Sequence, residues 1–372
     1  MPRFHSLTLV ATGYSPNLRL CRIPHKGRYR CKPRPRSVLT STDYYRKYPN
    51  DFMGKAIALF EVLGVFVVGN FAAGYLSRLL GVKSVGFNSP NPDFVTLSFL
   101  WLQAMCIQYA CLLLPAFAIG WWRRRWGPAH YGITKAGNPV PSLIVVGLIA
   151  FALVALPQQL LLVTNRFIPL GPEPPFWKLL DRNWTLSFWL FLATASFALT
   201  PCLEELFYRG YCQTRLEENF GGVGAILMVS LFMTLGHTQY HHWSILSIGQ
   251  IISLIPLTVG MGYVFWRTRS ILPAIILHGA DNVPTKGIYE FLLPATMVAA
   301  LILFRRSWWA EVQTFCRELA GKAWRGPALG GTLFAIVMTV GFEAAPGVFV
   351  PLAILGLSVA LIVEFMGRRQ KV

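Results

Sequence analysis

Glu204 and Glu205, two adjacent carboxylates inside an apolar stretch, have the side chains best suited to chemistry. A charge at the centre of a membrane helix costs about 2.5–3.5 kcal/mol, so such a pair needs a partner or a wet cavity. Arg209 follows Glu205 by four positions, the helical spacing and order that favour an ion pair. We predict that Glu205 pairs with Arg209 and that Glu204, which has no local partner, is a general base. The alternative is an ion-pair cluster that only holds the helices together.

A histidine ends the next apolar segment, which runs from Val223 to His237. The turn between the two segments lies near 220–222, sixteen positions after Glu204 and about as far before His237. In an antiparallel helix pair, with a rise of about 1.5 Å per residue, both side chains lie about 25 Å from the turn. The spacing therefore predicts Glu204 and His237 at the same height in the bundle.

A third polar group stands on the segment 270–282, where His278 and Asn282 are four positions apart. Ser270 can cap the start of this helix, and Pro273 fits its first turn. His278 and Asn282 share one helical face, so both can donate hydrogen bonds to one point, as an oxyanion requires. The alternative is that both side chains satisfy backbone groups at a helix break.

The histidine spacing also allows a metal site. His237 and His241 are four positions apart, as the zinc ligands of an HExxH helix are. Position 238 is Thr, so that motif is absent, and His241 falls where the segment should reach the membrane interface. We predict no cofactor; the alternative is zinc bound by Glu204, His237 and His278.

The composition indicates a membrane protein. Of the 372 residues, 54% are hydrophobic and only 13% are charged, against about 25% charged in soluble domains. The formal net charge of +18 comes from basic residues in the N-terminal tail and at the span ends expected on the inner side, which follows the positive-inside rule. No nucleic-acid motif accompanies them. The expected partners are the lipid bilayer and a membrane-associated protein or peptide substrate, with no nucleic acid.

The apolar blocks predict an all-α, polytopic transmembrane helix bundle of about eight to ten spans with an intramembrane active-site cavity. The seventh and ninth blocks are short and fit half-helices shielded inside the bundle. The basic segments alternate so that ten crossings leave both termini in the cytoplasm. The expected spans are 56–78, 95–121, 142–164, 185–208, 222–238, 244–266, 271–283, 287–304, 329–343 and 347–366.

The three motifs together resemble a known family. Glu204-Glu205-x-x-x-Arg209, His237 and His278-x-x-x-Asn282 occur in this order on successive apolar segments. This pattern, over about 185–300, is similar to the CAAX protease and bacteriocin-processing (CPBP, or Abi) family of intramembrane proteases. That family includes the type II CAAX prenyl endopeptidases.

The resemblance implies a role for each motif. Glu204 and His237 would activate the water that attacks the peptide bond, and His278 and Asn282 would hold the oxyanion. The resemblance also implies that Glu205 and Arg209 support Glu204. One departure concerns the second motif, usually Phe-x-x-x-His, because Met233 takes the Phe position and Phe232 lies one residue earlier. Met can fill the same volume, so we expect the change to affect the pocket's shape more than its chemistry.

These observations divide the chain into four parts. Residues 1–52 form a basic tail, expected to be disordered in the cytoplasm, or else an organellar targeting peptide. Residues 53–180 form N-terminal transmembrane helices, and 181–300 the CPBP-like catalytic core. Residues 301–372 comprise an amphipathic segment, expected as an interfacial helix over 305–327, and C-terminal transmembrane helices.

The predicted function is an intramembrane endopeptidase of the glutamic type, a family also labelled metalloprotease. It would hydrolyse a peptide bond of a membrane-tethered or prenylated substrate. One alternative is a non-catalytic membrane scaffold or bacteriocin self-immunity protein. Another is a proton-coupled transporter, because buried acids and a histidine also suit proton relay. The expected location is a bacterial cytoplasmic membrane, or an organellar membrane if the tail is a transit peptide.

Overall fold

The structure, a computed structural model, describes residues 52–82, 94–134, 137–172, 185–237, 240, 244–283 and 288–318. Every element in these ranges is a helix, which confirms the predicted all-α bundle. The basic tail up to residue 51 and the expected spans 329–343 and 347–366 lie outside the described residues. The helices are α2 (Phe52–Leu79), α3 (Phe94–Arg124), α4 (Val140–Val154), α5 (Leu156–Phe167), α7 (Leu186–Phe191), η1 (Leu192–Leu199), α8 (Thr200–Glu205), η2 (Leu206–Gln213), α9 (Thr214–Gly236), α10 (Ile245–Thr268), α11 (Leu272–Asp281), α12 (Tyr289–Leu303) and α13 (Arg305–Glu318).

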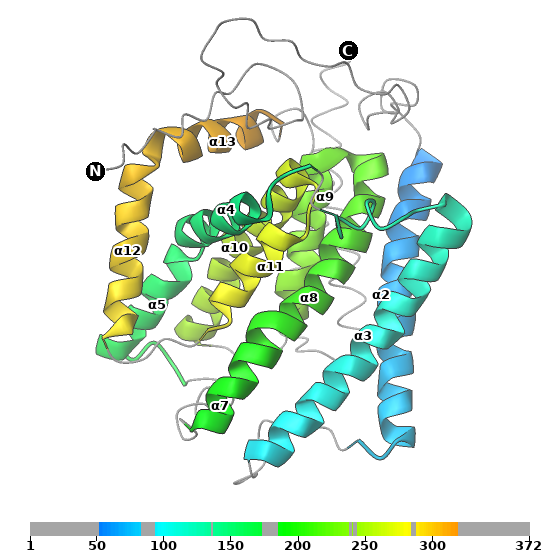
Figure 1. The fold of residues 1–372 in the computed structure, drawn as a ribbon, viewed down its shortest axis with the longest axis horizontal. Coiled ribbons are helices and arrows are strands. Elements are labelled where there is room, and N and C mark those ends of the chain that lie inside the picture. Colours follow the sequence, from blue (N-terminus) through cyan, green and yellow to red (C-terminus); the bar gives the residue numbers. More distant parts are fainter. Residues whose placement is uncertain are drawn as a thin grey trace, which may run out of the picture.

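The bundle has a layered order (Figure 1). The α2–α3 pair forms one edge, α12 lies at the other, and α8 to α11 lie between them. The α2–α3 contact is close because Gly69 leaves room for Leu112, whose Cδ2 lies 2.7 Å from where a Cβ would stand. Gln108 of α3 also donates to Asn70 of α2 at 3.0 Å. Small residues and interhelical hydrogen bonds of this kind join helices in lipid, where water is absent.

Helices that could cross a membrane account for much of the described chain. Four are long and apolar enough: Gly54–Leu79, Leu102–Arg124, Trp189–Gly236 and Ile245–Thr268. The bent pairs α4–α5 and α12–α13 raise the number to six if each counts as one span. By contrast α11, on the short seventh block, has ten residues and is half the length a span needs. The chain is therefore an integral, multi-pass membrane protein.

Two of the bends have clear causes. The expected span 142–164 breaks into α4 and α5, which meet at 48°. Pro157 lies at the start of α5 and has no N–H to continue the hydrogen-bond ladder of α4. At the other edge α13 turns 80° away from α12, and Glu311 of α13 accepts from Tyr263 and from Arg267 of α10, the latter at 3.2 Å. A helix is thus present after residue 305 within the described residues, and its place at the membrane interface stays a prediction.

The stretch that carries the two glutamates is helical from Leu186 to the turn but not uniformly α-helical. Short α8 is preceded by η1 and followed by η2, two π-helices with i→i+5 bonding. The turn after this arm lies at Gly221, where φ is 77° and ψ is 166°. Only glycine adopts such a conformation without strain. The turn predicted at 220–222 is therefore confirmed.

Replacing Gly221 with Ala is expected to destabilise the protein by about 1–3 kcal/mol, because the new Cβ forces the turn into a strained backbone region. Chemical unfolding in detergent micelles measures this change. Gly74→Ala in α2 is the matched control, since a Cβ there meets nothing within 4 Å. That control should be neutral or stabilising, because Ala is the better helix former. Equal losses in both variants would show that the turn geometry is not responsible.

A partly buried charge cluster, in which Glu61 and Arg215 are buried and Arg124 and Glu218 are partly exposed, fixes the hairpin turn against α2 and α3. Glu61 of α2 contacts Arg215 of α9 at 3.0 Å and Arg124 of α3 at 3.6 Å. Both arginines also pair with Glu218, and the hydroxyl of Tyr211 donates to Glu61. These groups compensate one another's charge. An isolated charge buried in the bundle would be strongly destabilising. The cluster holds the glutamate arm in one position.

Candidate functional site

His278 lies between the two glutamates. Its Nδ1 donates to Glu205 Oε1 at 2.9 Å, and its Nε2 stands 3.7 Å from Glu204 Oε2. The first distance is a hydrogen bond and the second is too long for one. Helix α11 comes this close to the glutamate arm because Gly279 packs on Phe197, whose carbonyl oxygen is 2.5 Å from the position of a Cβ. The motifs of two segments more than 70 positions apart therefore meet in one cluster.

Glu205 is the anchored member of the pair. Its carboxylate is fully buried and lies 3.2 Å from Arg209 Nε, so the predicted ion pair is present. Arg209 Nη2 in turn donates to the Thr258 carbonyl at 3.1 Å and contacts the sulfurs of Met233 and Met261, each at 3.4 Å. Met233 is the residue in place of the usual Phe, and here it packs on the guanidinium.

Glu204 is the accessible member of the pair. Its side chain is 15% exposed, whereas that of Glu205 is 0% exposed. The hydroxyl of Tyr109, from α3, interacts electrostatically with Glu204. Glu204 thus has partners from α3 and α11. The sequence predicted only that it has no partner on its own helix. Its partial exposure leaves it the carboxylate that an outside molecule can reach.

His237 is fixed through one ring nitrogen. Its Nδ1 lies 2.6 Å from the Met233 carbonyl oxygen, which can only accept, so Nδ1 carries a proton. In the neutral ring Nε2 then keeps its lone pair and can act as a base. A Cβ at neighbouring Gly236 would lie 3.7 Å from the Tyr208 hydroxyl of η2, so this end of α9 lies near the arm that carries the glutamates. The equal height of His237 and Glu204 stays a prediction. Among the described residues, however, His237 forms no ion pair with Glu204.

Asn282 has a structural partner. Its Nδ2 donates to the Ser196 carbonyl of η1 at 3.0 Å. In η1 the bonds run i→i+5, as from Thr200 N–H to Ala195 O, so the residue that would serve Ser196 is Pro201. Pro201 has no N–H, and Asn282 replaces the missing donor. One amide hydrogen of Asn282 thus satisfies a backbone carbonyl, which is the alternative that the sequence left open for this motif. The second amide hydrogen remains available for an oxyanion.

Some site residues escaped sequence reasoning. Tyr109 lies in an apolar segment with nothing nearby to single it out, and no spacing rule links it to Glu204. Gln158 and Asp281 were also missed; the Asp281 carboxylate interacts electrostatically with His278 and with Gln158. The sequence did hold a signal for each of them. Gln158 is a polar residue that follows Pro157 inside an apolar run, and Asp281 stands inside the His-x-x-x-Asn motif.

Glu204, His237 and His278, the residues of the zinc alternative, are not grouped as a metal site in the described ranges. In the described part of the chain, no three His, Cys, Asp or Glu side chains are grouped so that they could hold an ion. His278 Nδ1 is bound to Glu205 and His237 Nδ1 to a carbonyl, and among the described residues His237 forms no ion pair with either glutamate. These residues as arranged do not fit a zinc ion, and the chemistry below uses none.

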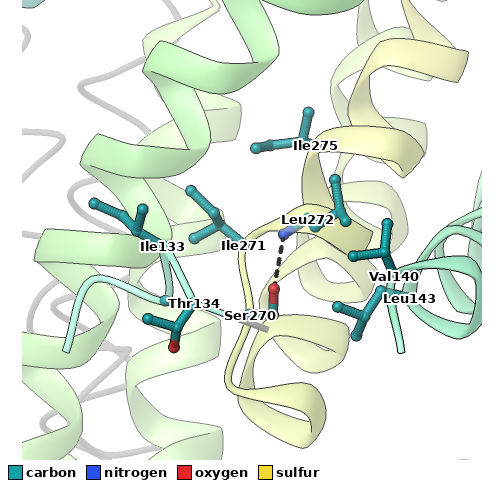
Figure 2. A pocket seen from close by; sticks show the side chains of 9 residues that line it. Ile133, Thr134, Val140, Leu143, Ser270, Ile271, Leu272 and Ile275 are labelled. Atoms are coloured by element: carbon teal, nitrogen blue, oxygen red, sulfur yellow. Dashed lines mark hydrogen bonds between the residues drawn. The ribbon is translucent and has the colours of Figure 1, made fainter. Parts of the chain in front are cut away.

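An apolar pocket lies near the start of α11 (Figure 2). Its volume is about 260 Å³, and its lining includes Ile133, Val140, Leu143, Ile271 and Ile275. At its edge Ser270 Oγ accepts from the Leu272 N–H at 3.4 Å. The N-cap of α11 is Ile271, which makes no side-chain cap hydrogen bond, so the prediction that Ser270 caps this helix was wrong. The lining has no titratable side chain, so the acid–base chemistry belongs to the cluster around His278.

The fold and site define a polytopic helical membrane protein with two carboxylates and a histidine in contact among its buried helices. Residues 184–284 match the family described as type II CAAX prenyl endopeptidase Rce1-like. The matched segment contains all three motifs and confirms the resemblance seen in the sequence. It covers less than a third of the 372 residues. No curated protein and no solved structure matches the chain. The family match indicates a membrane protease that acts on a membrane-associated substrate.

Proposed function

We propose that the protein is an intramembrane endopeptidase that hydrolyses a peptide bond of a membrane-tethered substrate, with prenylated proteins as the favoured class. The observation that carries the proposal is the contact of His278 with Glu204 and Glu205 inside a segment similar to CAAX prenyl endopeptidases. A CAAX sequence carries its prenyl group on the cysteine, which anchors the substrate in the bilayer. A site among membrane helices suits a substrate held there.

In the proposed reaction Glu204 and His237 activate a water. The lone pair at His237 Nε2 orients the water, and Glu204 takes its proton as the oxygen attacks the carbonyl carbon. A tetrahedral intermediate forms, its negative oxygen held by the free amide hydrogen of Asn282 and by His278 with a proton at Nε2. The C–N bond then breaks, and the amine leaves with the proton that Glu204 held.

Glu205 and Arg209 take supporting roles in this proposal. Glu205 holds His278 Nδ1 at 2.9 Å and so fixes the ring with Nε2 toward Glu204. Arg209 compensates the charge of Glu205, which has no exposure to water. We further propose that both termini are cytoplasmic. Arg124, Arg215 and Arg269 lie near one end of the bundle, and the positive-inside rule assigns an end rich in basic residues to the cytoplasm.

The direct test is to map cleavage products. Membranes containing the wild-type protein are incubated with a peptide that ends in a prenylated Cys-a-a-X motif, and the products are identified by mass spectrometry. Membranes with Glu204→Ala are treated alike. Cleavage that depends on intact Glu204 supports the proposal. If the wild-type protein cuts nothing, the protein has a non-catalytic or transport role instead. If Glu204→Ala cuts equally well, Glu204 is not the general base and the proposed site is wrong.

Chelation is expected to leave the activity unchanged. The described site residues offer no common metal position, and the proposed water activation needs only Glu204 and His237. The purified protein is dialysed against 1,10-phenanthroline, its zinc content is measured by mass spectrometry, and peptide hydrolysis is assayed before and after. A stoichiometric zinc ion, with activity that is lost on chelation and restored by zinc, would contradict this prediction and favour the zinc alternative.

A further inference from the structure

Helix α13 lies across one end of the bundle, whereas α12 stands along it (Figure 1). The 14-residue α13 begins directly after α12 and turns 80° away from it. A helix that turns this far from a neighbouring membrane helix runs along the membrane surface and not through the bilayer. The reaction proposed above does not use α13, so the function of its outer side has to be found elsewhere.

One side of α13 is docked on α10. Glu311 accepts hydrogen bonds from Tyr263 and from Arg267, the latter at 3.2 Å. Phe315, one helical turn further on, packs edge-on against the Tyr263 ring, with the ring centroids 5.9 Å apart. Residues four positions apart lie on the same face of a helix, so both contacts belong to one side of α13. The helix is therefore held in one orientation, and its other side faces away from the protein.

The outer side combines arginines with large apolar side chains. Arg306 and Arg317 are exposed, and their eleven-residue spacing is about three helical turns, so they share one face about 16 Å apart. Trp309, which is 53% exposed, lies between them, and all three side chains are roughly 120° or more around the helix from Glu311. Arginines beside an exposed tryptophan are typical of helices that lie at the level of lipid headgroups.

The arginines of the outer side lack carboxylate partners in the part of the chain that the structure describes. Arg305 donates to the Ile302 carbonyl at 3.3 Å, and Arg317 donates to Thr314 at 3.2 Å. The described carboxylates at this end of the bundle already pair with other arginines. These pairs are Glu61–Arg215, Glu217–Arg269, Glu218–Arg124 and Glu311–Arg267. The positive charge of the outer side is thus left uncompensated by them.

The remaining sequence is itself basic and is a poor source of the missing anions. Asp43 and Asp51 are the only acids among residues 1–51, and Lys and Arg far outnumber them. Residues 319–372 contain only Glu343 and Glu364, again fewer than their basic residues. An anionic partner from outside the chain therefore fits this surface better. Because α13 lies along the membrane surface and exposes Trp309, a lipid headgroup matches it better than an acidic protein does.

We propose that the outer side of α13 is a binding surface for anionic phospholipids. Arg306 and Arg317 contact the phosphate groups, and Trp309 lies at the boundary between the headgroups and the acyl chains. The anionic lipids of a membrane surface attract basic segments next to membrane spans. This surface is separate from the glutamate cluster, and its ligand binding does not depend on the proposed protease function.

The test compares two lipids that differ in headgroup charge. Purified protein in dodecyl maltoside is titrated with phosphatidylglycerol or with phosphatidylcholine of the same acyl chains, and bound lipid is counted by native mass spectrometry. Wild-type protein should bind phosphatidylglycerol about tenfold or more tightly than phosphatidylcholine. The double variant Arg306→Gln/Arg317→Gln should lose about 10- to 30-fold in affinity for phosphatidylglycerol, because each surface arginine contributes a factor of about five. Its affinity for phosphatidylcholine should stay within about twofold of wild type.

A matched control separates this surface from the total charge. Arg123 and Arg125 are two exposed arginines at the same end of the bundle but outside α13. The variant Arg123→Gln/Arg125→Gln removes the same charge and should keep the affinity for phosphatidylglycerol within about threefold. An equal loss in the two double variants would overturn the proposal, because the net charge of this end and not α13 would then attract the lipid. Equal affinity of wild-type protein for the two lipids would overturn it as well.

The measurement remains informative if a variant folds poorly or if the protein cuts no peptide. The preference for phosphatidylglycerol over phosphatidylcholine is a ratio taken within one variant, so the fraction of folded protein cancels. Lipid binding needs no catalysis, and failure of the proposed protease function leaves the expected result unchanged. As a second check, Trp309→Ala should weaken the binding of both lipids by a similar factor, because the ring contacts parts that they share. A loss confined to phosphatidylglycerol would contradict the position given to Trp309.

Discussion

Replacing Glu204 with Gln is expected to lower kcat for peptide hydrolysis by a factor of about 10²–10⁴, the usual contribution of a general base. Gln keeps the size and the polarity of the side chain but cannot take the proton of the attacking water. Its amide can still interact with the Tyr109 hydroxyl, so the helix contacts survive. The KM should change little, because Glu204 binds the water in the proposed reaction and not the substrate chain. Initial rates on a quenched prenylated peptide in proteoliposomes measure both constants.

The control for this experiment is a carboxylate outside the site. Glu290 of α12 pairs with Arg166 at 3.9 Å and is 20% exposed, close to the exposure of Glu204. Glu290→Gln should therefore retain wild-type kcat. A second variant, His237→Gln, should lose kcat by a similar factor, because its amide nitrogen cannot replace the lone pair of Nε2. If Glu204→Gln retained kcat, Glu204 would not be the general base. If neither protein hydrolysed the peptide while the variant lost a proton flux that the wild type shows in proteoliposomes, the transporter alternative would stand in place of the protease.

Features set by spacing along one or two neighbouring helices were predictable from the sequence. The four-residue spacing of Glu205 and Arg209 gave the ion pair, and Gly221 marked the hairpin turn. These predictions needed only the local geometry of a helix and the glycine at its break.

Contacts between elements distant in the sequence were not predictable in the same way. The position of His278 between the glutamates depends on how closely Gly279 approaches Phe197, and no periodicity specifies that. The π-helices η1 and η2 leave no mark on the hydrophobic pattern, so the orphan carbonyl of Ser196 and its bond to Asn282 could not be foreseen. The break between α4 and α5 was signalled by Pro157, but the apolar run through it concealed the effect.

The buried Glu205–Arg209 pair should dominate the stability of the core. Arg209→Met is expected to cost about 3–5 kcal/mol of unfolding free energy, because it leaves the fully buried Glu205 charge uncompensated. Glu205→Gln should cost a similar amount by stranding the arginine. The double variant should recover much of the loss, since a neutral pair has no charge to solvate. Unfolding by denaturant in detergent micelles gives all four free energies for a double-mutant cycle.

The contrast with an exposed pair shows that burial is the cause. Arg166 is 60% exposed and lies 3.9 Å from Glu290, so Arg166→Met should change the unfolding free energy by no more than about 1 kcal/mol. Comparable losses in Arg166→Met and Arg209→Met would mean that lost side-chain packing, and not an unpaired buried charge, explains both. A double variant no more stable than Arg209→Met would point the same way. Recovery in the double variant alone would show that Arg209 exists to keep Glu205 charged, and so to hold His278 beside Glu204.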